Sequence, residues 1–150
     1  MGPREIGWMF AECSSVMILV QVFVLAPLLK RIGNGLLAPA FLAMAAGVAL
    51  LPYATSYFLL LLGVGVVAAA AGVLIPTLAY LVLLAAGARQ GAALGKQTAA
   101  ASLGQAAGSA AAGWLFALFV GAPFWVTAGL LGLGVLAARR VPASIQETGV

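Results

Sequence analysis

Long apolar runs, separated by short breaks rich in Gly, Pro or polar residues, make up almost the whole chain. A run of about 20 such residues is long enough for an α-helix to cross the hydrocarbon core of a bilayer. We therefore predict an all-α integral membrane protein, a bundle of about five transmembrane helices in a single membrane domain covering residues 1–150. The predicted spans are residues 7–29, 35–53, 57–86, 97–120 and 121–138, and residues 139–150 form a cytoplasmic tail.

Composition excludes a soluble domain, because 65% of the 150 residues are apolar and only 7% are charged. Most of the basic residues lie in pairs where an apolar run ends. These pairs are Lys30/Arg31, Arg89/Lys96 and Arg139/Arg140. Because basic residues favour the cytoplasmic side, we expect a multi-pass protein of the cell (inner) membrane with its N-terminus outside and its C-terminus cytoplasmic. The net charge of +4 is then explained by topology and predicts no nucleic-acid partner.

Aromatic residues support the same orientation. Four of them fall near the predicted outer ends of the spans, where an interfacial belt is expected. They are Trp8, Tyr53, Tyr57 and Trp125.

The chain has few side chains of the kinds that catalyse reactions or bind metal ions. It has no His, a single cysteine, Cys13, and three acidic residues, all of them Glu. A zinc site uses three or four His, Cys or carboxylate ligands, and a nucleophile needs a base within reach. We therefore expect no metal, no catalytic residue and no bound cofactor, and we do not expect an enzyme.

Two polar side chains of the first predicted span are candidates for a substrate site. Glu12 lies about five residues into the span and is either an acid wetted at the interface or a proton or substrate site facing a cavity. Gln21 lies deeper, where an amide must find a partner, either a substrate or another helix.

The third predicted span contains Pro76, which removes a helical hydrogen bond and predicts a kink. Thr77 and Tyr80 follow on the bent segment and are candidates to line a cavity. The alternative is that Gly and Pro are simply common in membrane helices.

The fourth predicted span carries two distinct faces. Thr98, Ser102, Gln105 and Ser109 fall within about 60° of one another and form a polar stripe. Polar positions in membrane helices favour the interior of a bundle, so the polar stripe predicts a water-lined cavity. The alternative is that its hydroxyls bond back to their own helix.

A small-residue face lies beside the polar stripe. It consists of Ala101, Gly104, Gly108 and Ala111, with the spacing GxxxG that lets two helix backbones approach closely. We predict that Gly104 and Gly108 are helix-packing positions.

Two segments resemble the Major Facilitator Superfamily, in particular the C-terminal half of its drug:proton antiporters. RQGAALGKQTAAASLGQAAGSAAAG, from Arg89, is similar to the junction between that family's tenth and eleventh helices, with Gly91 and Gly95 as the loop glycines. APLLKRIGNG is similar to a degenerate copy of the cytoplasmic loop motif GxLxDRxGRR, in which Arg31 and Gly33 match. Lys30 replaces the motif's Asp, and Ser109 stands where the antiporter pattern has Pro.

The resemblance implies that the spans correspond to helices eight to twelve of a twelve-helix transporter, a partial major-facilitator fold. It implies efflux of a small organic molecule or drug by alternating access, with coupling to a proton gradient and cavity lining by the eighth, tenth and eleventh helices. We expect the chain to be incomplete alone, with three kinds of partner: the lipid bilayer, a small-molecule substrate, and the missing N-terminal half or another copy of the chain. The alternative is a small oligomerising membrane scaffold or interaction protein without transport activity.

Overall fold

A computed structural model of the chain describes residues 3–25 and 36–139, and almost all of these residues are helical. The prediction of an all-α bundle is therefore confirmed for the described part of the chain. In chain order the elements are α1 (Pro3–Leu19), the π-helical η1 (Val20–Leu25), α3 (Leu37–Leu50), the 3-10 turn η3 (Leu51–Tyr53), α4 (Tyr57–Ala86), the 3-10 turn η4 (Gly87–Arg89), α5 (Gln90–Leu118) and α6 (Ala122–Arg139).

Local chemistry explains where α4, the longest helix, begins and ends. Ser56 precedes it with extended backbone, and its Oγ accepts the N–H of Leu59 at 3.2 Å, which caps the first turn. Gly87 follows it with φ of 52°, a left-handed conformation that glycine adopts without strain. α4 continues as one helix through Pro76.

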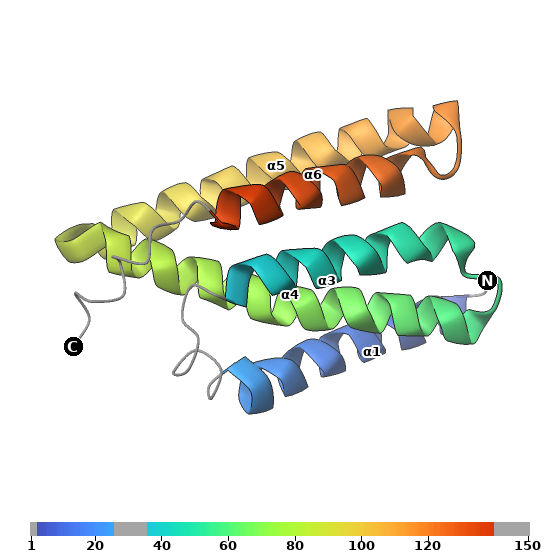
Figure 1. Cartoon of the computed structure of the whole chain (residues 1–150), viewed down its shortest axis with the longest axis horizontal. Helices are drawn as coiled ribbons and strands as arrows, with labels where there is room; N and C mark the ends of the chain where they lie inside the picture. The colour runs from blue at the N-terminus through green and yellow to red at the C-terminus, as the bar shows by residue number, and fades with distance from the viewer. Residues whose placement is uncertain (1–2, 26–35, 140–150) are drawn as a thin grey trace.

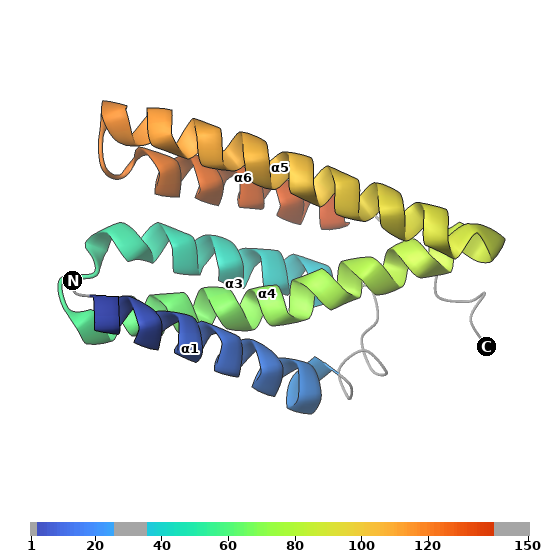
Figure 2. The same cartoon turned by 180° about the vertical axis from the view of Figure 1, so that it is seen from behind.

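The helices form an open bundle rather than a closed ring. α1 packs against α4, α4 against α3, and α3 against α6, while α5 lies alongside α6 at the far edge (Figures 1 and 2). A small core lies between α3 and α4, where Leu37, Ala40 and Leu74 are buried. α5 has no buried residue, and neither has α1 among the side chains that the structure describes.

The connections divide the bundle into two ends. The start of α1, the α3–α4 connection and the α5–α6 connection lie at one end, and η4 lies at the other together with the C-terminal end of α6 (Figure 1). Among the described basic residues, Arg89, Lys96 and Arg139 therefore belong to the η4 end, whereas Arg4 belongs to the opposite end. The other three paired basic residues, Lys30, Arg31 and Arg140, lie outside the described residues.

Candidate functional site

The seam between α1 and α4 brings one acidic side chain into the bundle. The half-buried positions of this part of the chain recur every three or four residues, as expected for one face of a helix packed on another. They are Met9, Glu12, Cys13, Val16, Met17, Val20 and Gln21. Two glycines of α4, Gly65 and Gly72, lie opposite this face.

Glu12 lies directly against Gly65. A Cβ placed on Gly65 would be 3.6 Å from Oε1 of Glu12, an ordinary contact distance, so the carboxylate lies beside α4 at this position. The other oxygen, Oε2, is buried and has no hydrogen-bond partner among the described residues. A buried polar oxygen without a donor is unfavourable, and Oε1 of Gln97 in α5 is in the same situation among the described residues.

The other candidates near this seam have different surroundings. Gln21 is half-buried in the π-helical turn η1, a type of turn often found at functional sites. Thr77 is only 1% exposed, and its Oγ1 donates to the carbonyl oxygen of Val73 at 2.6 Å. Tyr80 is 46% exposed and points out of the packed core. Thr77 and Tyr80, which we predicted to share a cavity, therefore have opposite exposures.

The polar stripe of α5 lies on the surface of this chain. All four of its residues, Thr98, Ser102, Gln105 and Ser109, are exposed. Ser109 Oγ donates to the carbonyl oxygen of Gln105 at 2.8 Å, so this hydroxyl bonds back to its own helix. No residue of the polar stripe lines any of the three cavities described for the chain.

The small-residue face of α5 is equally open. A Cβ added at Gly104 or Gly108 would meet nothing within 4 Å among the described residues, and the same holds for the predicted loop glycines Gly91 and Gly95. Among the described residues neither Gly104 nor Gly108 packs against another helix. Their role as helix-packing positions stays a prediction.

Other glycines do the packing inside the chain. An added Cβ would lie 2.8 Å from Val67 at Gly47, 2.8 Å from Leu51 at Gly63 and 2.7 Å from Phe41 at Gly134. The sequence marked none of these three as a packing position. In a chain so rich in glycine, a glycine can be recognised as a packing position only when it is known which helix lies beside it.

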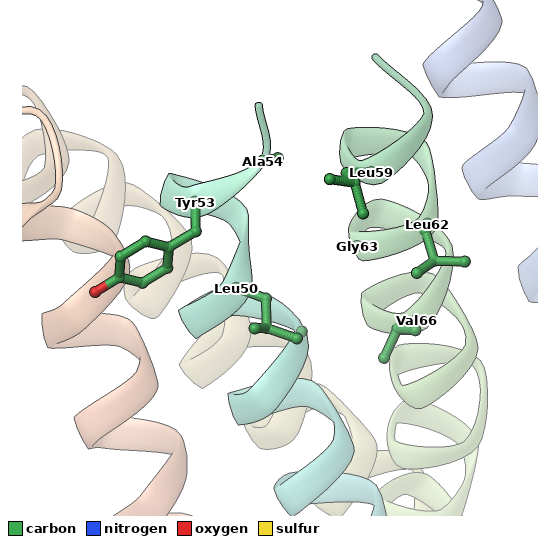
Figure 3. Close-up of a pocket in the computed structure, with 8 residues that line it drawn as sticks. Leu50, Tyr53, Ala54, Leu59, Leu62, Gly63 and Val66 are labelled. Carbon is green, nitrogen blue, oxygen red and sulfur yellow. The ribbon is translucent and has the colours of Figure 1, made fainter. Parts of the chain in front are cut away.

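Two apolar cavities lie along α3. One, of about 160 Å³, lies between the end of α3 and the start of α4 and is lined by residues such as Leu50, Leu59 and Val66. Figure 3 shows the Tyr53 ring directed away from α4, toward α6, where it meets Trp125 edge-on with centroids 6.2 Å apart. The other, of about 360 Å³, lies between η1, α3 and α4. None of the predicted site residues lines either cavity.

The structure describes only some residues of the predicted cytoplasmic loop motif. Arg31 and Gly33 lie outside the described residues, and Arg89 is exposed in η4. Across residues 3–25 and 36–139, no group of three or more Cys, Asp or Glu side chains is placed to hold a metal ion.

The length and apolar composition of the helices indicate the class of protein. Within the described ranges, three helical stretches are long and apolar enough to cross a membrane, namely Arg4–Val24, Tyr57–Leu118 and Ala122–Arg139. The second stretch is 62 residues long and contains α4 and α5, which are joined by η4. A shorter apolar stretch, Leu37–Tyr53, contains α3. These features are those of a multi-pass α-helical membrane protein, which lives in a lipid bilayer.

Comparison with known families gives the particular family. Residues 1–148 match the Major Facilitator Superfamily, and the chain belongs to that superfamily. The family consists of transporters rather than enzymes. Searches of curated proteins and of solved structures returned no match.

Proposed function

We propose that the chain is the C-terminal portion of a secondary active transporter that exports a small organic molecule or drug by alternating access. In this proposal the chain is incomplete alone and works with a complementary N-terminal half, and transport is coupled to a proton gradient. The paired basic residues support an orientation with the N-terminus outside and the C-terminus cytoplasmic.

The observation that carries the proposal is the environment of α5. This helix has no buried residue, yet it carries the amide of Gln105 and the hydroxyls of Ser102 and Thr98 on an open surface. Lipid offers no hydrogen-bond partner to these groups, so a surface of this kind favours contact with water or protein. A cavity closed by a second helix bundle would supply both water and protein groups as hydrogen-bond partners.

A paired variant tests the polar stripe. We expect Ser102→Leu with Gln105→Leu to abolish transport when the chain is joined to its complementary half, while insertion into the membrane is unchanged. Leu103→Ala is the matched control, because Leu103 is exposed on the same helix but lies off the polar stripe. Unchanged export by the double variant would remove Ser102 and Gln105 from the cavity.

A second candidate function is an oligomerising scaffold without transport activity. The open small-residue face favours it, since GxxxG surfaces join helices of separate chains. Cross-linking of the chain alone distinguishes the two functions. A scaffold forms a defined homo-oligomer that Gly104→Leu abolishes, whereas half of a transporter is recovered in a defined complex only with its complementary half.

A further inference from the structure

The largest of the three cavities described for the chain lies between η1, α3 and α4, and we call it the η1 groove. Its volume is about 360 Å³, against about 160 Å³ and about 280 Å³ for the other two. The smaller cavities lie toward the aromatic end of the bundle, because Tyr53 lines one of them and Ile6 lines the other. The η1 groove is therefore the cavity nearest to the basic end.

α4 forms the floor of the η1 groove, and two other helical segments form its walls. The floor consists of Ala69, Ala70 and Val73, which span one turn of α4. Val20 and Val24 of η1 form one wall, and the start of α3 forms the other. Both η1 and α3 pack against α4, and the groove is the space that they leave between them.

The lining of the η1 groove favours an apolar guest. Four of its nine lining residues are alanines, namely Ala40, Ala43, Ala69 and Ala70, and these small side chains leave the space unfilled. All nine are apolar, so they give water no side-chain hydrogen-bond partner. An empty groove leaves its lining without dispersion contacts. An engineered apolar cavity of about 150 Å³ already binds benzene, and the η1 groove has more than twice that volume.

The mouth of the η1 groove opens on a surface that contacts the bilayer. Val24 and Ala43 line opposite walls and are also exposed, whereas Ala70, on the floor, is only 5% exposed. Next to them in the sequence, Phe23 is 69% exposed and Leu42 is 50% exposed. Large apolar side chains exposed on a membrane-spanning helix meet the hydrocarbon of the lipid. The groove is therefore continuous with the interface between protein and lipid.

The depth of the floor corresponds to the middle of a lipid chain. Ala70 comes thirteen residues after Tyr57, the first residue of α4, which is about 20 Å along the helix. The hydrocarbon core is about 30 Å thick, so the floor lies in the leaflet toward η4. At this level the leaflet contains acyl chains and no headgroups.

We propose that the η1 groove binds one acyl chain of a membrane phospholipid. The chain enters between Val24 and Ala43 and lies against Ala69 and Ala70. A helix of another polypeptide fits less well, because it is about 10 Å wide and packs over several turns, whereas the floor is one turn long. The site does not rest on the proposed transport activity, and its test uses no transport assay.

Photolabelling from within the bilayer tests the site. The probe is phosphatidylcholine with a diazirine in the middle of one acyl chain, mixed into phosphatidylcholine vesicles that contain the purified chain. We expect mass spectrometry to find the label on Ala70 and Val73 of the floor. Lipid that only surrounds the bundle does not reach Ala70, because this residue is buried. A diazirine placed beside the glycerol is expected to leave the floor unlabelled.

A filled groove is expected to lose the label. Ala69→Leu adds three carbons on the floor, so we expect Ala70 and Val73 to become unlabelled while Ile75, which is 56% exposed, keeps its label. Ala85→Leu is the matched control, because Ala85 is an exposed alanine of the same helix outside the groove. Both floor residues stay labelled in this control.

Three results would overturn the proposal. Labels confined to exposed residues such as Ile75 would show that lipid surrounds the bundle without entering it. Floor labels that persist in Ala69→Leu would show that they do not report the groove. Floor labels that disappear when the chain is joined to its complementary half would assign the groove to a helix of that half. Where Ala69→Leu fails to fold, Ala43→Phe fills the groove from the opposite wall, and the same loss of label is expected.

Discussion

Gly72 and Gly104 are the same residue in the middle of long helices, yet their surroundings differ completely. A Cβ at Gly72 would lie 3.3 Å from the carbonyl oxygen of Met17 and 3.4 Å from its Cα, so the backbone of α1 leaves almost no space for it. A Cβ at Gly104 would meet nothing within 4 Å in the described part of the chain. A glycine acts as a packing position only where another backbone comes close.

We expect Gly72→Ala to destabilise the chain by about 1–3 kcal/mol, because α1 must move away from α4 to admit the methyl group. Thermal unfolding in detergent, followed by the fluorescence of the three tryptophans, measures the loss as a lower midpoint.

Two alanine variants serve as controls for Gly72→Ala. Gly65→Ala places its methyl group at an ordinary contact distance of 3.6 Å from Glu12, and Gly104→Ala places it in open space, so neither is expected to lower the midpoint. Alanine is also about 0.5–1 kcal/mol better than glycine within a helix. Equal midpoints for all three variants would contradict the close approach of α1 and α4 at Gly72.

At the scale of the helix, the apolar pattern of the sequence predicts much of what the structure contains. The predicted range 57–86 has the bounds of α4, whereas the predicted range 97–120 begins seven residues after the start of α5. The late start arose because the basic segment from Arg89 to Lys96 was interpreted as a loop, although it is helical from Gln90 onward. Basic residues mark the end of the apolar run but do not end a helix.

Which helices are neighbours could not be predicted in the same way. The period of 3.6 residues identified the polar stripe on α5, but it contains no information on what the stripe faces. Glu12 illustrates the same limit, because its position in the sequence left open whether it is wetted at the interface or faces a cavity. Its contact with Gly65 depends on α1 packing against α4, which is fixed by residues more than fifty positions apart.

The small-residue face of α5 has no neighbouring helix in the described part of the chain, and this leads to a prediction for Gly108. We expect Gly108→Leu to leave the unfolding midpoint of the isolated chain unchanged, because a Cβ added at Gly108 would meet no other helix within 4 Å in the described part of the chain. The same variant is expected to prevent co-purification with a complementary half, since a leucine fills the small-residue face where a second backbone would approach. Gly129→Leu in α6, an equally open glycine, is the control that keeps the complex. Association that survives Gly108→Leu would exclude this face as the contact surface.

At the scale of the molecule, the two ends of the bundle differ in charge and aromatic content. Arg89, Lys96 and Arg139 belong to the end that contains η4, and Tyr53, Tyr57 and Trp125 lie at the opposite end. Tyr53 and Trp125 contact each other edge-on at that end. A basic end and an aromatic end predict one orientation in the membrane, with η4 in the cytoplasm.

Thiol labelling of intact cells measures that orientation directly. Cys13 is the only cysteine, so Cys13→Ser gives a background free of thiols into which single probes can be introduced. We expect Thr55→Cys, in the exposed α3–α4 connection, to react with a membrane-impermeant maleimide from outside. Ala88→Cys, exposed in η4 beside Arg89, should react only after the membrane is permeabilised. The reverse pattern would show an inverted chain, and labelling of both probes from outside would show that the basic residues do not fix a single orientation.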